Sequence, residues 1–204
     1  MLSSNEEIIR MLAVEPENLI RMLILLIGDN PDREGLKDTP ARVVSAWREW
    51  AIGYSMKPKE ILKTFKDGAN GMDEMVIVHN IPFNSFCEHH LAPMRGIAHV
   101  GYIPNGKIVG LSKLARLVDC FARRLQVQER CTVQIADALV EHLEPLGAGV
   151  LIRASHGCME TRGVKIQGSL TTTSAMRGAL LTGYQARNEF LQLCRMAEKE
   201  FSHG

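Results

Sequence analysis

Residues 97–107 read IAHVGYIPNGK, a β-branched run that ends in a turn sequence. The run predicts a strand, and Pro104-Asn105-Gly106 predicts that the chain then reverses its direction. Toward the N-terminus, MVIV at 75–78 predicts a preceding strand. Toward the C-terminus, apolar residues recur twice at helical spacing before two more strand-like runs, at 150–154 and 164–173.

The two helices predicted between these strands each carry one apolar stripe. Ser112 is the expected N-cap of the first helix, and its stripe is Leu114, Leu117, Val118, Phe121 and Leu125. Gln128-Glu129 opens the second helix and Pro145 ends it; its stripe is Val127, Cys131, Ile135, Ala138 and Leu139. The order strand, strand, helix, helix, strand, strand predicts an α+β fold.

A helical segment in three pieces is predicted ahead of these strands, over residues 1–66. The apolar residues that mark the pieces are Ile8, Ile9 and Leu12, then 19–27, then Val43, Val44, Trp47 and Trp50. Thr39 is the expected N-cap of the third piece, with Pro40 in its first turn. Because 66–73 is polar and contains two glycines, we predict a helical segment at 1–66 and a second domain at 67–204.

The composition is that of an ordinary globular protein. Of 204 residues, 46% are hydrophobic and 23% charged, which is enough to bury a core without disulfides. The net charge of +1 predicts neither a nucleic-acid nor a membrane partner. No apolar stretch approaches the roughly 18 residues of a transmembrane helix, and the N-terminal residues resemble no targeting peptide. Five cysteines at irregular spacing predict free thiols and a cytoplasmic protein.

Two short stretches are rich in metal-binding residue types. Cys87-Glu88-His89-His90 offers a thiolate and imidazoles, and His156-Gly157-Cys158 repeats the combination at the end of a predicted strand. Alone, a Cys-x-x-His pair is as often a buried thiol beside polar histidines; two such stretches favour zinc. Five candidate donors cannot all bind one zinc, and a histidine left over beside the metal is suited to proton transfer.

Two further groups of polar residues suggest a nucleotide ligand. Lys113 and Arg116 lie in the first turns of a predicted helix, where backbone N–H groups already attract anions, so a polyphosphate could bind there. Glu129, beside Gln128, opens the next helix; its carboxylate either pairs with the helix dipole or accepts two hydrogen bonds from a guanine edge. The remaining histidines and cysteines are expected to be structural, exposed or in the core: His79, His99, His142, His203, Cys120, Cys131 and Cys194.

Between residues 35 and 190 the chain resembles the GTP cyclohydrolase I family. The matching stretches are GLKDTPARV (35–43), SFCEHHLAP (85–93), HVGYIP (99–104), GLSKLAR (110–116), QVQER (126–130), HGCMETRG (156–163) and SLTTTS (169–174). The resemblance implies the tunnelling fold, a four-stranded antiparallel sheet with two helices on one face, in which the sheets of several subunits close into a barrel. It also implies a homodecamer of two pentamers with active sites at subunit junctions.

The same resemblance implies roles for individual residues. The implied Zn²⁺ ligands are Cys87, His90 and Cys158. The implied catalytic residues are His89, His156 and Ser112. Guanine would be held by Glu129 and Gln128, and the triphosphate by Lys113, Arg116, Arg162 and Arg42. The implied reaction converts GTP to 7,8-dihydroneopterin triphosphate and formate: a zinc-activated water adds to C8 of guanine while His156 protonates N7.

Two other functions compete with this one. A non-catalytic assembly protein would hold a structural zinc, with His89 or His156 completing four protein ligands. Zinc-dependent base deamination requires His-x-Glu together with Pro-Cys-x-x-Cys, an arrangement that the chain lacks. The sequence leaves open which pathway receives the pterin (folate, tetrahydrobiopterin or deazaguanine), whether a regulatory protein binds, and what residues 1–34 do.

Overall fold

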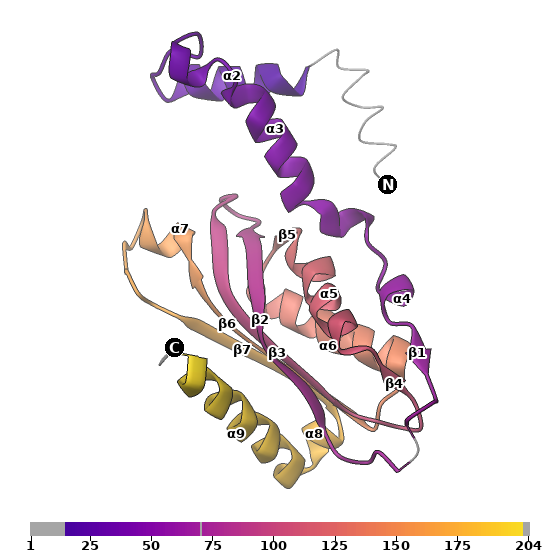
Figure 1. Ribbon diagram of the computed structural model, residues 1–204. Helices are drawn as coiled ribbons and strands as arrows, with labels where there is room; N and C mark the ends of the chain where they lie inside the picture. The colour runs from indigo at the N-terminus through magenta and orange to yellow at the C-terminus, as the bar shows by residue number, and fades with distance from the viewer. Residues whose placement is uncertain (1–14, 70, 202–204) are drawn as a thin grey trace. The chain divides into compact units, whose positions relative to one another are not determined.

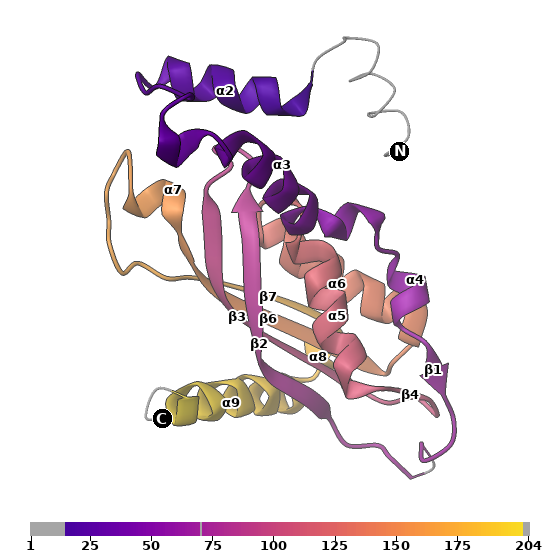
Figure 2. The ribbon, with the colours of Figure 1, turned by 45° about the horizontal axis from the view of Figure 1, so that its top comes forward.

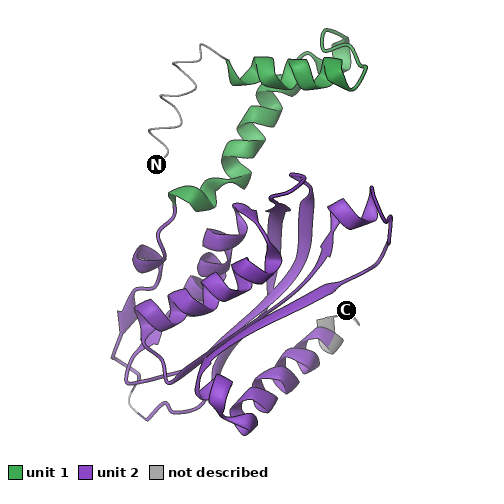
Figure 3. Ribbon diagram, turned by 180° about the vertical axis from the view of Figure 1, so that it is seen from behind, with its two compact units in different colours: residues 1–55 green, residues 56–204 purple. Residues whose placement is uncertain are grey.

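The computed structural model describes residues 15–69 and 71–201 (Figure 1). The chain divides into two compact units, residues 1–55 and 56–204 (Figure 3). Residues 56–66 thus belong to the second unit, whereas the domain boundary predicted from sequence, at 66/67, stays a prediction. The first predicted helical piece, with Ile8, Ile9 and Leu12, lies outside the described residues.

The described part of the first unit is helical, as predicted. It contains α2 (Pro16–Leu26), the 3₁₀ turn η1 (Glu34–Leu36), α3 (Thr39–Trp50) and the 3₁₀ turn η2 (Ile52–Ser55). The prediction that Thr39 caps α3 is wrong. The cap is Asp38, because its carbonyl accepts the first helical hydrogen bond from the Arg42 N–H at 3.0 Å. The helix therefore begins one residue earlier than expected.

The second unit is built on an antiparallel sheet. Its long strands are β2 (Val76–Cys87), β3 (Pro93–Ile103), β6 (Gly147–His156) and β7 (Thr171–Gly178), paired in that order, which confirms four antiparallel strands. A fifth strand was not predicted: β5 (Leu125–Gln126) pairs in parallel with the end of β2. Outside this sheet, α4 (Pro58–Ile61) leads to β1 (Thr64–Phe65), which pairs with β4 (Ile108–Val109).

Helices cover both faces of this sheet (Figures 1 and 2). The predicted helices α5 (Leu111–Ala122) and α6 (Gln128–Leu143) pack on one face, against alternate strand residues such as Val100 and Ile152. On the opposite face, α8 (Ala179–Thr182) and α9 (Tyr184–Phe201) bury a smaller core of Leu151, Met176, Leu180, Phe190 and Cys194. Covering of both faces explains why the middle of β3 and the first part of β6 are continuously buried instead of alternating between buried and exposed residues.

Two local predictions in this unit are wrong. Residues 164–170 are not a strand: after α7 (Gly157–Glu160) the chain turns, with positive φ angles at Gly163, Lys165 and Gly168, and the strand begins only at Thr171. Ser112 does not cap α5, because the N-cap is Gly110 and no side chain caps the helix.

Among the described helices, none combines the length and the apolar character needed to cross a bilayer.

Candidate metal centre and active site

One end of the sheet collects residues that are far apart in the sequence. Cys87 ends β2, the turn at 88–90 follows, and β3 begins beside the end of β6, where Met94 pairs with His156. The parallel pairing of Cys87 with Gln126 brings the start of α6 to the same place. At Gly157 a Cβ would lie 3.0 Å from the Pro93 carbonyl oxygen, so glycine allows the chain to turn closely past β3.

Cys87, His90 and Cys158 form a group that we call the first cluster. Their ligand atoms all lie within 4.8 Å of one another, and the Cys87 Sγ is 3.8 Å from the His90 Nδ1. Burial raises the pKa of the Cys158 thiol, and the neighbouring Cys87 sulfur adds to this effect. A divalent cation bound here would offset both effects, because it stabilises the deprotonated thiolates. Two sulfurs with one nitrogen are donors that zinc prefers. The three residues therefore fit a zinc ion.

His156 stands beside this cluster and is oriented by Gln128. Its Nε2 lies 2.8 Å from the Gln128 Oε1. Gln128 is fully buried, and its amide nitrogen lies 3.1 Å from the Ile152 carbonyl oxygen and 3.0 Å from that of Thr171. Because carbonyl oxygens only accept, these contacts fix which end of the amide faces His156. The His156 Nε2 therefore carries a proton, and its Nδ1 is left with a lone pair.

The turn at 88–90 is held to α6 by an ion pair. Glu88 accepts hydrogen bonds from Arg130, with its Oε1 3.3 Å from the Arg130 Nη1, and this pairing lowers the pKa of Glu88. His89 is exposed in the same turn, with its Nδ1 3.8 Å from the Cys87 Sγ. An exposed imidazole beside the first cluster is available to a bound substrate.

The residues predicted to bind substrate fall into two groups within this chain. Glu129 is exposed in the first turn of α6, and the Arg162 Nη1 lies 2.9 Å from the His90 Nε2, so both belong to the end of the sheet that carries the first cluster. Ser112, Lys113 and Arg116 lie at the start of α5. This helix begins beside β4 and runs toward the cluster for 12 residues, about 18 Å, so Ser112 and Lys113 are at the other end and Arg116 is midway along the helix. Arg42, in the first unit, pairs with Asp38 at 2.9 Å.

Several contacts were not foreseen from the sequence. The buried hydrogen bonds of Gln128 could not be predicted from the local sequence, because an amide side chain at the start of a helix is usually exposed. His79 and His99, expected to lack metal-binding neighbours, lie together with Cys194, and their ligand atoms also fall within 4.8 Å. We call these three residues the second cluster. Only the pairing of strands and the position of α9 reveal it.

The comparisons of the sequence with known proteins agree on one family. The family described as GTP cyclohydrolase I matches residues 16–195. "GTP cyclohydrolase 1" of Janthinobacterium sp. (strain Marseille) is 58% identical, over 86% of this chain and 88% of its own length, and that of Nitrosospira multiformis is 53% identical, over 86% and 92%. Among solved structures, the apo form of an archaeosine synthase QueF-Like covers 51% of this chain and 93% of its own, with a TM-score of 0.41 and 17% identity.

Proposed function

Since this chain belongs to the GTP cyclohydrolase I family of enzymes that act on GTP, we propose that it converts GTP to 7,8-dihydroneopterin triphosphate and formate, the first step of pterin and folate-type synthesis. The observation that carries this proposal is the juxtaposition of a three-residue zinc-type cluster with an oriented histidine that is not part of it. The five free thiols suit a reducing compartment, and we place the enzyme in the cytoplasm.

Cys87, His90 and Cys158 would hold the zinc. When bound, zinc acts as a Lewis acid that makes water a nucleophile near neutral pH. The cluster includes neither His89 nor His156. Three protein ligands leave room for a reactant, whereas a structural zinc has four protein ligands. A position left open beside the exposed His89 therefore supports catalysis over the alternative of a non-catalytic assembly protein.

His156 is the proposed acid for N7 of guanine. Its Nε2–H donates to Gln128, so His156 acts as an acid only in its doubly protonated form, and the proton that it transfers is one that Nδ1 has first taken up. Gln128 thereby acts as a positioning residue, and its burial leaves it poorly placed to contact guanine directly. His89, exposed in the turn beside the cluster, is the proposed second acid–base group, and Glu129 is the proposed partner of the guanine edge.

The triphosphate would be bound by residues of more than one subunit. Arg162 is a cation beside the first cluster, but Lys113 and the proposed catalytic Ser112 start α5 at the other end of the sheet, and Arg116 lies midway along that helix. A tetra-anionic tail needs several cations, so we propose that a neighbouring subunit supplies Lys113, Arg116 and Ser112, and that Arg42 also acts at a subunit junction. This suits a homodecamer of two pentameric rings, in which open sheet edges pair into a barrel.

The decisive experiment measures formate release and pterin fluorescence from GTP, with the metal content determined in parallel. We expect turnover that a chelator abolishes and added zinc restores. His156→Ala should keep the zinc of the first cluster but lose about 10²–10⁴-fold in kcat, the usual contribution of a general acid. Full turnover by metal-free protein would refute the zinc mechanism, and loss of the metal from His156→Ala would show that His156 is a ligand.

A further inference from the structure

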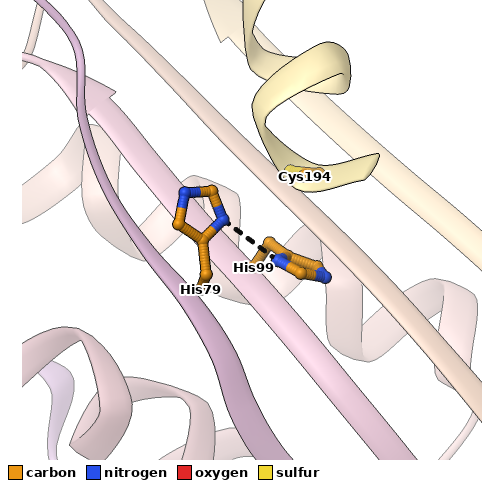
Figure 4. Close-up of side chains that lie close together, drawn as sticks. All are labelled: His79, His99 and Cys194. Carbon is orange, nitrogen blue, oxygen red and sulfur yellow. Dashed lines mark hydrogen bonds between the residues drawn. The ribbon is translucent and has the colours of Figure 1, made fainter. Parts of the chain in front are cut away.

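The second cluster lies between the sheet and α9, on the face away from α5 and α6. His79 comes from β2, His99 from β3 and Cys194 from α9, and the close-up shows the two imidazoles beside the helix that carries the cysteine (Figure 4). We propose that these three residues bind a second zinc ion, separate from the reaction, which fastens α9 to the sheet; because His99 and Cys194 are fully buried, its fourth ligand would be a water and not a substrate. No step of the proposed chemistry uses any of them.

A β-bulge in β2 builds one side of this site. Val78 pairs with Val100 and Ile81 with Ala98, so His79 and Asn80 together oppose His99 alone. The extra residue is Asn80, which has a φ of 51° and donates from Nδ2 to the Ala197 carbonyl oxygen of α9 at 3.3 Å. Because of the bulge, Ile81 returns to the core under α5 and α6 while His79 stays on the α9 face.

The two histidines are already spaced as zinc ligands. The His79 Nδ1 lies 3.3 Å from the His99 Nδ1. Two nitrogens bound to zinc at about 2.0–2.1 Å with tetrahedral angles are separated by roughly 3.3 Å. Without a metal, one proton lies between these nitrogens as a hydrogen bond; zinc would replace that proton without moving the rings apart.

A carboxylate lies near the Nε2 of His99, the ring nitrogen that would not bind the metal. Most metal-bound histidines have such a partner at their second ring nitrogen. His99 is fully buried, and among the described residues its Nε2 has no hydrogen-bond partner of acceptable geometry, although the Glu198 Oε1 is 3.4 Å away. Glu198 is held in turn by the Arg153 Nη1 at 2.6 Å. Coordination through Nδ1 requires a proton on Nε2, and Glu198 is the acceptor for that proton.

The third ligand comes from the same face of α9 as Glu198. Cys194 and Glu198 are four residues apart and so lie on one side of the helix, next to Phe190. Burial raises the pKa of the Cys194 thiol to about 12, so the thiol keeps its proton unless a cation replaces it. With the metal bound, the Cys194 thiolate and the Glu198 carboxylate would offset most of the positive charge of the site, and the Arg153 guanidinium that also pairs with Glu198 would leave one positive charge over.

Zinc content of the full-length protein tests the proposal. After dialysis against a weak chelator, the wild type should hold one zinc per chain more than Cys194→Ala. The matched control is Cys131→Ala, which also removes a fully buried thiol but one outside both clusters; it should hold as much zinc as the wild type. Cys194→Ala should still turn over GTP. Equal zinc in the wild type and Cys194→Ala would overturn the proposal.

Two further variants keep the test decisive if Cys194→Ala folds poorly. His79→Gln changes a half-buried side chain and should lose the same zinc. Glu198→Gln should weaken this zinc about 10–100-fold in competition with a chromophoric chelator, as loss of a supporting carboxylate usually does. In Cys158→Ser, which removes a ligand of the first cluster, the second zinc should remain, so that failure of one site is distinguishable from failure of the other. Unchanged zinc content in His79→Gln would contradict the proposal of a second zinc site.

Discussion

The two clusters use the same residue types in opposite settings. In the first, two cysteines and a histidine lie at a turn and a strand end, with an exposed histidine beside them. In the second, two histidines and a cysteine come from a bulge, a strand interior and a helix, and two of the three are fully buried. Because chemistry on a substrate needs access, only the first is suited to catalysis, whereas the second is suited to holding elements together.

Removing a thiolate of the first cluster should have the largest effect and separates the two roles. In Cys158→Ser we expect GTP turnover to fall to background, because the remaining Cys87 and His90 cannot hold zinc for the reaction. Formate release and zinc content measure this, with Cys131→Ala as the control for loss of a thiol. A Cys158→Ser enzyme with substantial turnover would mean that the first cluster is not the metal centre of the reaction.

Truncating the amide beside the first cluster should have a smaller effect. Gln128→Ala removes the group that orients His156, and we expect kcat to fall about 10²-fold, the size of effect that a misplaced catalytic group produces. The KM for GTP should change little, since Gln128 is buried. Gln134→Ala, which alters another amide on α6, is the control. Equal kcat in both variants would remove the positioning role.

The bulge that builds the second cluster should be sensitive to the residue at its extra position. Asn80→Val places a β-branched residue at a φ of 51° and loses the hydrogen bond to Ala197. The left-handed backbone costs about 1–2 kcal/mol and the hydrogen bond about 1 kcal/mol, so the free energy of unfolding in urea should fall by about 2–3 kcal/mol. Asn80→Gly, which tolerates this backbone, should lose less. Equal stability of Asn80→Val and wild type would contradict this account.

Breaking an ion pair outside both clusters should have the smallest effect on stability. Glu144 is exposed and accepts from the Lys107 Nζ at 2.7 Å, which lowers its pKa below the ordinary 4.5. A carboxyl group whose pKa is lowered by folding stabilises the folded state at pH values above its ordinary pKa. This stabilisation is lost as the pH falls through the lowered pKa. Glu144→Gln should therefore be slightly less stable than wild type at pH 7, with no difference well below pH 4.5. Thermal unfolding across this range checks it; a large difference at low pH would contradict it.

The difference between the two clusters also shows what could be predicted from the sequence. The order of strands and helices and the two stretches rich in metal-binding residues could be found in the sequence, whereas the antiparallel pairing and the choice of Cys87, His90 and Cys158 among five candidates came from the family resemblance. The second cluster could not be found in this way, because each of its histidines lies alone in a strand. Its formation depends on the register shift at Asn80 and on α9 packing against the face that carries His99.

Irregular backbone accounts for the remaining errors. Val164 and Ile166 alternate as in a strand, but Gly163 and Gly168 support turns with positive φ. The parallel strand β5 has only two residues and therefore no periodicity to detect. The contact of Gln128 with guanine stays a prediction, but neither the burial of this amide nor its partners Ile152 and Thr171 could be inferred from local sequence.

The contact between Gln128 and the Thr171 carbonyl has a consequence for assembly. Thr171 begins β7, and no described strand lies beyond β7 in the sheet order. In the proposed ring, a neighbour docked along this strand would steady the backbone that aligns His156. A subunit diluted out of its ring would then retain its metal ligands and still turn over less well, so that specific activity would report on ring integrity.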